Sequence, residues 1–228
     1  MNDDQQALAT FSGLARLFPL PNVVLFPHVI QPLHVFEPRY RQLTADALAD
    51  DQLLAMALLR PGWEENYEGR PPLYSVACLG RITAHKQLAD GRYIILLRGL
   101  SRIRLGEEIP SEKDYRLARA ELLADVPSLS LDESRQVRQR LTELVMARFS
   151  GPDEEKTQLR EMFEGEVAIG ALCDHLCYRF PLPLEFKQEF LEEPDVGVRA
   201  RRLLENLEAF AETQTAEARK FPPDFSVN

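Results

Sequence analysis

The stretch LFPLPNVVLFPHVIQPLHVF, from Leu17 to Phe36, contains no charged residue. A membrane-spanning helix needs about 20 predominantly apolar residues, so the length alone would allow one. The stretch also contains four prolines, at positions 19, 21, 27 and 32. Each proline removes a backbone donor and biases the preceding residue towards an extended conformation, which a lipid-facing helix does not tolerate. The stretch therefore predicts two buried strands joined by a proline-rich loop in a water-soluble core.

The remainder of residues 1–125 continues this β-type pattern, with period-two alternation interrupted by turn residues. Roughly six strands and one short helix are expected, which favours a small closed or nearly closed sheet. Gly80 and the Arg98–Gly99 junction are predicted bulges or bends. The other expected features are strands at Ala15–Leu20, Pro32–Phe36, Gln52–Arg60 and Tyr115–Asp125, a polar loop at Pro61–Pro72 and a hairpin turn at Ala89–Gly91. A helix is expected to begin at Pro38, with Tyr40, Leu43, Ala47 and Leu48 at helical spacing.

Beyond residue 125 the apolar residues change to a helical spacing. We predict an α+β protein in which a β-rich domain (1–125) precedes an α-helical bundle (126–214) and a flexible tail (215–228). Within the bundle we expect a break at Gly151–Lys156 and helices from Ser130 or Asp132 to about Phe149, over Glu161–Arg179, from Pro183 to Leu191 and over Val196–Ala211. The apolar stripe of the last helix is expected to be Leu203, Leu204, Leu207 and Phe210.

Charge and cysteine content restrict the partners and the compartment. The net charge is -9, and most of it falls in residues 126–228. Because nucleic-acid affinity depends largely on neutralising phosphates with Lys and Arg, we expect no nucleic-acid partner. Arg102 and Arg104 alternate with apolar residues, as expected for the solvent face of a half-buried strand. Three cysteines and the absence of a secretion signal at the start predict a cytoplasmic protein without a membrane partner.

Three segments together resemble the Lon-protease N-terminal, or LON substrate-binding, domain. The first is FPLPNVVLFPHVIQPLHVFEPRYRQL (Phe18–Leu43), which is similar to the opening motif of the family's stand-alone bacterial members. The second, Gly80–Leu105, looks like the family's middle hairpin, and the third, Phe180–Leu207, is similar to its helical tail. The resemblance covers about residues 14–212 and implies a PUA-like pseudobarrel followed by a helical bundle.

One position departs from the family pattern. His28 stands where the family commonly has glycine, a residue that readily adopts a positive φ.

The resemblance also implies a recognition part without catalytic modules. The ATPase of a full Lon protease needs a phosphate loop of the form G-x-x-x-x-G-K-[ST], and the sequence contains no Gly-Lys pair. No Ser–Lys peptidase domain is expected after residue 212 either. We therefore expect a non-enzymatic module, without cofactors, that binds unfolded or exposed apolar segments of other polypeptides.

Four aromatic residues are the candidate peptide-binding residues: Trp63, Tyr67, Tyr40 and Phe36. Trp63 and Tyr67 lie in the polar loop beside several charged residues, and aromatic residues on loops often anchor binding surfaces. Alternatively, Trp63 folds back and covers the end of the barrel. A peptide groove is expected between this loop, the helix beginning at Pro38 and the helical bundle.

The stretch CDHLC, Cys173–Cys177, raises a rival possibility. Cys173 and Cys177 lie at i and i+4 on one helical face and could supply two thiolates, but His175 points elsewhere and two ligands do not complete a tetrahedral site. The simpler interpretation is that both cysteines pack as small apolar residues. A Cys-based metal protein or hydrolase is thus a third possibility, after a recognition module and an adaptor that docks onto one protease or chaperone partner.

Overall fold

The computed structural model describes residues 3–67, 69–147 and 153–220. Contacts between residues divide the chain into two compact units. The first unit consists of residues 1–125 and 174–194, and the second of residues 126–173 and 195–228. The predicted domain boundary after residue 125 stays a prediction, because this grouping does not show that either part folds alone.

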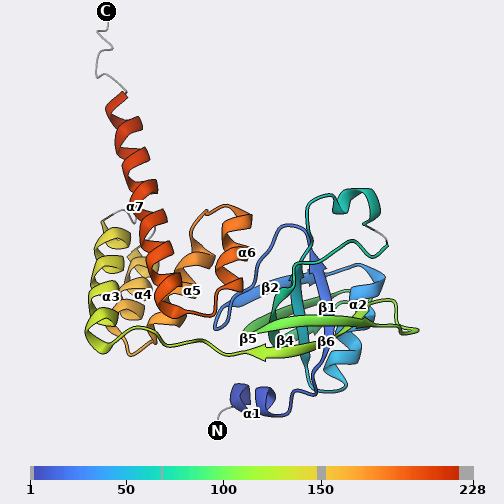
Figure 1. Ribbon diagram of the computed structural model, residues 1–228. Helices are drawn as coiled ribbons and strands as arrows, with labels where there is room; N and C mark the ends of the chain where they lie inside the picture. Colours follow the sequence, from blue (N-terminus) through green and yellow to red (C-terminus); the bar gives the residue numbers. More distant parts are fainter. Residues whose placement is uncertain (1–2, 68, 148–152, 221–228) are drawn as a thin grey trace, which may run out of the picture. The chain divides into compact units, whose positions relative to one another are not determined.

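The first unit is built on a sheet of six strands (Figure 1). The strand order is β2-β5-β4-β3-β1-β6, and a further pairing of β5 with β6 closes the sheet into a barrel. Neighbouring strands are antiparallel except β1 and β3, which are parallel. The predicted β-rich pseudobarrel is confirmed. Its strands are β1 (Leu14–Leu20), β2 (Ile30–Val35), β3 (Leu53–Leu58), β4 (Val76–Gln87), β5 (Tyr93–Ile109) and β6 (Arg116–Leu123).

The proline-rich stretch forms β1, a loop and β2, as predicted, but the expectation that both strands are buried is wrong for β2. The loop buries Val24, Leu25 and Phe26 in the core, whereas β2 buries only one of its six residues. His28 adopts a φ of 68°, the left-handed conformation that glycine takes at low cost. Its backbone N–H donates to the Gly99 carbonyl at 2.8 Å, which holds the loop against β5.

Two glycines face each other where β4 and β5 bend. Gly80 pairs with Gly99, and the register shifts between Leu79 and Gly80, as predicted for this point. Gly99 also donates its N–H to the Val29 carbonyl at 2.8 Å. A Cβ atom at Gly99 would overlap the carbonyl oxygen of Phe26, so the close approach of the loop requires a glycine here.

Besides the later residues of α5 (Ile169–Arg179), the described part of the first unit has four short helices: α1 (Asp3–Ala9), α2 (Pro38–Leu48), the 3-10 helix η1 (Trp63–Asn66) and α6 (Leu184–Glu192). In α2, Pro38 occupies the first turn, and Tyr40, Leu43 and Ala47 are buried as predicted. Helix α1 was not expected from the sequence, because it buries none of its residues. An ion pair between Asp4 and Arg81 at 2.9 Å links it to β4.

The second unit contains α3 (Leu131–Met146), α4 (Asp153–Glu164), α7 (Val196–Lys220) and the first residues of α5 (Ile169–Arg179). Helix α3 packs against α4 and α7. Its N-terminus has a complete capping box, in which the Ser130 hydroxyl accepts from the Glu133 N–H while the Glu133 carboxylate accepts from the Ser130 N–H. Leu203 and Leu207 of α7 are buried, as predicted.

The predicted helix Glu161–Arg179 is wrong in one respect, because the chain forms two helices there. Helix α4 ends at Glu164, next to Gly165, and α5 begins only at Ile169. Arg138 donates to the carbonyls of Phe163 and Val167, so a side chain satisfies backbone acceptors at the break.

Two further helix boundaries differ from expectation. Helix α4 already begins at Asp153, inside the predicted break Gly151–Lys156, whose first two residues lie outside the described part of the chain. Helix α7 continues to Lys220 rather than ending at Ala211. Residues 221–228, the end of the predicted tail, lie outside the described residues. Over the part of the chain that the structure describes, no helix has the length and apolar character needed to span a membrane.

Candidate functional site

An aromatic stack with an arginine in its middle connects β1, α2 and the loop that carries η1. The rings of Phe18 and Tyr40 stack with their centroids 4.2 Å apart. The Arg39 guanidinium lies 4.8 Å from the Tyr40 centroid and 4.7 Å from the Tyr67 centroid. Trp63 meets Tyr67 edge to face at 5.4 Å. The structure therefore brings together three of the four predicted binding residues, and Arg39 links them.

Hydrogen bonds hold this aromatic stack in place. The Tyr67 hydroxyl donates to Glu37 at 2.8 Å, and Arg39 donates to Glu37 at 3.0 Å and to the Tyr67 carbonyl at 3.2 Å. The Tyr40 hydroxyl donates to the Pro19 carbonyl at 2.7 Å. Burial, followed by the hydrogen bond to Glu37, raises the pKa of Tyr67, and burial raises the pKa of Tyr40. Both phenols remain neutral hydrogen-bond donors at physiological pH.

The local sequence explains why the two sides of the stack meet. Glu37 has an extended backbone and Pro38 begins α2, so Arg39 and Tyr40 fall in its first turn. On the other side, Gly62 adopts a φ of 88° and turns the chain into η1. In Figure 1 the loop around η1, drawn in teal, extends beyond the strands of the barrel.

A small pocket lined mostly by apolar side chains adjoins Trp63. Its volume is about 190 Å³, and the indole forms part of the wall. We call it the Trp63 pocket. It is lined by Pro21, Leu58, Leu59, Pro61, Trp63, Glu64, Tyr74, Leu184 and Glu185, the last two from α6. Trp63 is half-buried, so its ring supports the pocket and also remains accessible from solvent.

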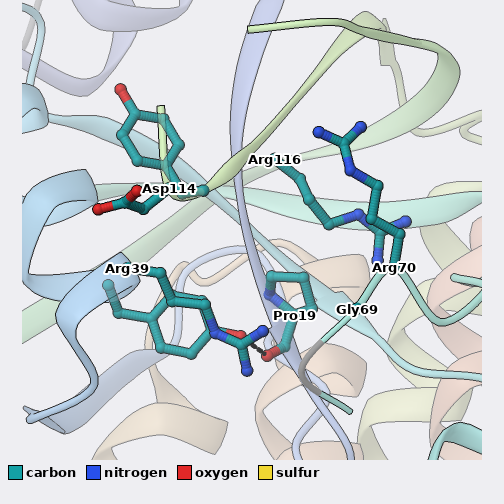
Figure 2. A pocket seen from close by; sticks show the side chains of 8 residues that line it. Pro19, Arg39, Gly69, Arg70, Asp114 and Arg116 are labelled. Carbon is teal, nitrogen blue, oxygen red and sulfur yellow. Dashed lines mark hydrogen bonds between the residues drawn. The ribbon is translucent and has the colours of Figure 1, made fainter. Parts of the chain in front are cut away.

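A second pocket lies beside Arg39 and Tyr40 of the stack (Figure 2). It has a volume of about 220 Å³, and three guanidinium groups line it. We call it the arginine pocket. Its lining residues are Pro19, Arg39, Tyr40, Gly69, Arg70, Asp114, Tyr115 and Arg116. Because Arg39 belongs to both the stack and this pocket, and Trp63 to both the stack and the Trp63 pocket, the stack connects the two pockets.

Phe36 lies apart from the stack. Its side chain is 59% exposed, and its ring lies 6.0 Å from that of His34. Ile30 on β2 and Ile94 and Leu96 on β5 are also exposed, and in the register of the two strands His34 pairs with Ile94. These residues form an apolar outer sheet face. Tyr40, in contrast, is buried and supports the stack from below rather than facing solvent. That any of the four binds a peptide stays a prediction.

The CDHLC stretch forms part of α5. Cys173 and Cys177 are both fully buried, and His175 is half-buried. Among the described residues, no group of three or more His, Cys, Asp or Glu side chains is placed to hold a metal ion.

Asp174, the acidic residue of the CDHLC stretch, pairs with Arg102, a partner that the sequence did not suggest. Arg102 is 2% exposed, and its Nη2 donates to Asp174 at 2.6 Å. It also donates to the Leu191 carbonyl at 3.0 Å and to Asp125 at 3.1 Å. The prediction that Arg102 faces solvent together with Arg104 is wrong, because residues of α5 and α6 cover it. The sequence feature that could have indicated a buried partner was Asp174, a charged residue in a mostly apolar stretch of a predicted helix.

Comparisons with known proteins agree on one family. The profile of the ATP-dependent protease La (LON) substrate-binding domain matches residues 15–209. Lon protease 2 of Myxococcus xanthus is 29% identical over 191 residues, which are 84% of this chain and 23% of that protein. The Lon protease of Escherichia coli K12 is 28% identical over 212 residues, 89% of this chain and 26% of that protein.

Solved structures share the fold. The N-terminal domain of the Mycobacterium avium complex Lon protease matches with a TM-score of 0.67 at 18% identity, covering 86% of this chain and 98% of that one. The Lon N-terminal domain protein from Xanthomonas campestris matches with a TM-score of 0.58 at 21% identity, covering 84% and 96%. The chain belongs to the LON substrate-binding domain family. It spans about a quarter of the length of the curated relatives it matches.

Proposed function

We propose that this protein is a non-enzymatic recognition module that binds exposed apolar segments of other polypeptides at the Trp63 pocket. The observation that carries the proposal is a half-buried indole on the wall of a mostly apolar pocket, held by a hydrogen-bonded aromatic stack. A rigid aromatic residue beside a pocket of apolar residues is typical of binding sites. Its ring is already held in place, so it loses little conformational entropy when a client side chain binds against it. The family membership supports the same function.

The pocket volume limits what enters it. A space of about 190 Å³ admits one large side chain, such as Leu or Phe, rather than a folded surface. Affinity then comes mainly from apolar burial, at about 25 cal/mol per Å² of area removed from water. We therefore expect broad, weak binding of many unfolded clients in the cytoplasm, without nucleic acid or membrane as partners and without hydrolysis of ATP or peptide bonds.

Binding at the pocket can be followed by tryptophan fluorescence, because Trp63 is the only tryptophan of the chain. The experiment is to titrate the protein with a tryptophan-free peptide, blocked at both ends and with a Leu-Phe-Leu core, and to record tryptophan emission. We expect a saturable change. The variant Leu184→Gln places an amide in the pocket wall and should weaken binding at least several-fold, whereas Leu131→Gln changes a leucine that is 79% exposed on α3 and should not.

The result that contradicts the proposal is equally clear. If the apolar peptide leaves the emission unchanged, or if both variants behave like the parent protein, the Trp63 pocket is not the binding site. Circular dichroism of each variant confirms that it has folded.

The outer sheet face favours a second candidate function, an adaptor that docks onto one folded partner such as a protease or chaperone. Exposed apolar side chains grouped on one face often mark protein interaction sites. Phe36→Ser together with Ile94→Ser should abolish such docking but leave peptide binding at Trp63 unchanged. Loss of a single stoichiometric partner in this double variant, with peptide binding intact, would favour the adaptor.

A further inference from the structure

The arginine pocket gathers positive charge from three separate segments. Arg39 lies in the first turn of α2, Arg70 follows η1, and Arg116 begins β6. Among the described lining residues the one carboxylate is that of Asp114, and in Figure 2 it points away from the guanidinium groups of Arg70 and Arg116. Arginine is the residue that most often recognises carboxylates, because its planar N–H groups match their two oxygens.

Two of the three arginines are held firmly in place. Arg39 donates to Glu37 and to the Tyr67 carbonyl. Arg116 donates through Nε and Nη2 to Glu108, and through Nη1 to the Pro71 carbonyl at 2.7 Å. A guanidinium has five N–H donors, so each of these two keeps donors beyond the bonds named here. Their partners fix the shape of the pocket and offset much of their charge.

Arg70 differs from both. Its side chain is 54% exposed, and among the described residues the carboxylate that it pairs with is Glu108, at 3.6 Å to Oε2. That same oxygen already accepts from Nε of Arg116 at 3.0 Å. Within the described part of the chain, Arg70 is thus the least neutralised of the three arginines, and the ion pair that it would leave to turn towards a ligand is a long one.

We propose that the arginine pocket binds a carboxylate group of the same polypeptide whose apolar side chain occupies the Trp63 pocket. The carboxylate belongs to an Asp or Glu side chain or to the end of a chain. This inference rests on the proposed function and narrows its clients to apolar segments with a nearby acidic group.

The spacing of the stack fits this two-part recognition. Arg39 and Trp63 both contact the ring of Tyr67, at 4.7 Å and 5.4 Å from its centroid, so at most about three residues of extended chain separate them. An extended chain advances about 3.3 Å per residue, so an acidic group roughly three residues from the apolar side chain reaches the arginine pocket.

Three peptides test the proposal, each with an acetylated N-terminus and the same Leu-Phe-Leu core. One carries a single Asp three residues after the core and an amide end, the second has Asn in place of Asp, and the third ends at that position in a free carboxylate. Titration followed by Trp63 emission should show that the first or third peptide binds about threefold to fivefold more tightly than the second, the range of a partly exposed ion pair. Added salt should reduce the difference.

A matched pair of variants assigns the effect to the pocket. Arg70→Gln should remove the preference for a carboxylate while leaving binding of the Asn peptide unchanged. Arg92→Gln removes one positive charge of similar exposure (43%) in the β4–β5 hairpin and should keep the preference.

The outcomes separate this inference from the proposed function. Equal binding of all three peptides overturns the carboxylate site but is compatible with apolar recognition. The same conclusion follows if Arg70→Gln and Arg92→Gln lose the preference for a carboxylate to the same extent. Binding of none of the peptides overturns both. A preference for the third peptide alone supports the site and identifies the chain end as the source of the carboxylate.

Discussion

The Arg102 guanidinium and the Asp174 carboxylate form a two-pronged ion pair, with N–O distances of 2.6 Å and 3.0 Å, in which both side chains are almost fully buried. The pair joins β5 of the barrel to α5, and the bond from Arg102 to the Leu191 carbonyl adds the end of α6. Buried charges are tolerated only when they are paired and hydrogen-bonded. The pair is therefore one of the links that hold residues 174–194 to the barrel, with which they group.

Replacing Asp174 with alanine should destabilise the protein by about 3 kcal/mol, because it leaves a buried guanidinium with incomplete compensation. Asp125→Ala removes a partner that is 38% exposed and should cost less than about 1 kcal/mol. Urea unfolding measures both values. The double variant Arg102→Met with Asp174→Leu should recover much of the loss. If Asp174→Ala costs no more than Asp125→Ala, the pair is not a main link between α5 and the barrel.

The outline of the fold could be predicted from short-range patterns. Alternation and prolines in the first half, and helical spacing in the second, depend on which residues face the core within one element. The stripe of Tyr40, Leu43 and Ala47 and the bend at Gly80 are confirmed for that reason. The break between α4 and α5 was missed, because backbone acceptors there are satisfied by Arg138, a side chain of another helix.

The site could be predicted only in part. Trp63 and Tyr67 stood out as aromatic residues in a polar loop, and Tyr40 as one on the neighbouring predicted helix. Arg39, which joins them, had the appearance of an ordinary surface charge. The arginine pocket and the pair of Arg102 with Asp174 depend on contacts between residues distant in the chain. No local periodicity contains that information.

Gly99→Ala should destabilise the protein by about 3 kcal/mol or more, since the new methyl group overlaps a backbone carbonyl that cannot turn aside. Gly106→Ala on the same strand is the control, because its Cβ would lie 3.5 Å from the nearest atom, the Arg119 carbonyl oxygen, an ordinary contact. Thermal and urea unfolding compare the two. Similar stabilities would mean that the loop around Phe26 can move away from β5.

Two replacements of Tyr67 should have different effects, because one keeps the aromatic ring in the stack and the other removes it. Tyr67→Phe removes the hydroxyl bond to Glu37 but keeps the ring over Arg39, and should cost about 1 kcal/mol of stability. Tyr67→Ala also removes the cation–π contact and the support of Trp63, and should weaken binding of the apolar peptide several-fold. Equal peptide binding by the two variants would show that the ring does not position Trp63.

His28→Gly should stabilise the protein by about 0.5–1 kcal/mol, because the left-handed conformation costs a side-chain-bearing residue roughly 1–2 kcal/mol and glycine very little. Part of the gain is lost to the greater freedom of glycine in the unfolded chain. Gln52, with a φ of 62°, offers an independent test by Gln52→Gly. His28→Val should be destabilising, and a stabilising valine would refute the assignment of strain to this position.

His175 should make stability depend on pH in the mildly acidic range. Burial lowers its pKa below the ordinary 6.5, and His28, Arg179 and Arg98 lower it further against the opposing effect of Asp174. Between the folded pKa and 6.5 the unfolded chain binds a proton that the folded chain does not, so acidification favours unfolding. This loss is absent above the unfolded pKa and grows as the pH falls through 6.5 towards the folded pKa.

Urea unfolding at pH 7.5, 6.5 and 5.5 measures this slope, since most carboxylates remain ionised over that range. His175→Gln cannot take up the proton, so its stability should fall less between pH 7.5 and 5.5 than that of the parent protein. His85→Gln, which removes an exposed histidine from β4, is the matched control and should fall as the parent does. A steeper slope in His175→Gln would mean that His175 is stabilised in its charged form, with Asp174 outweighing burial.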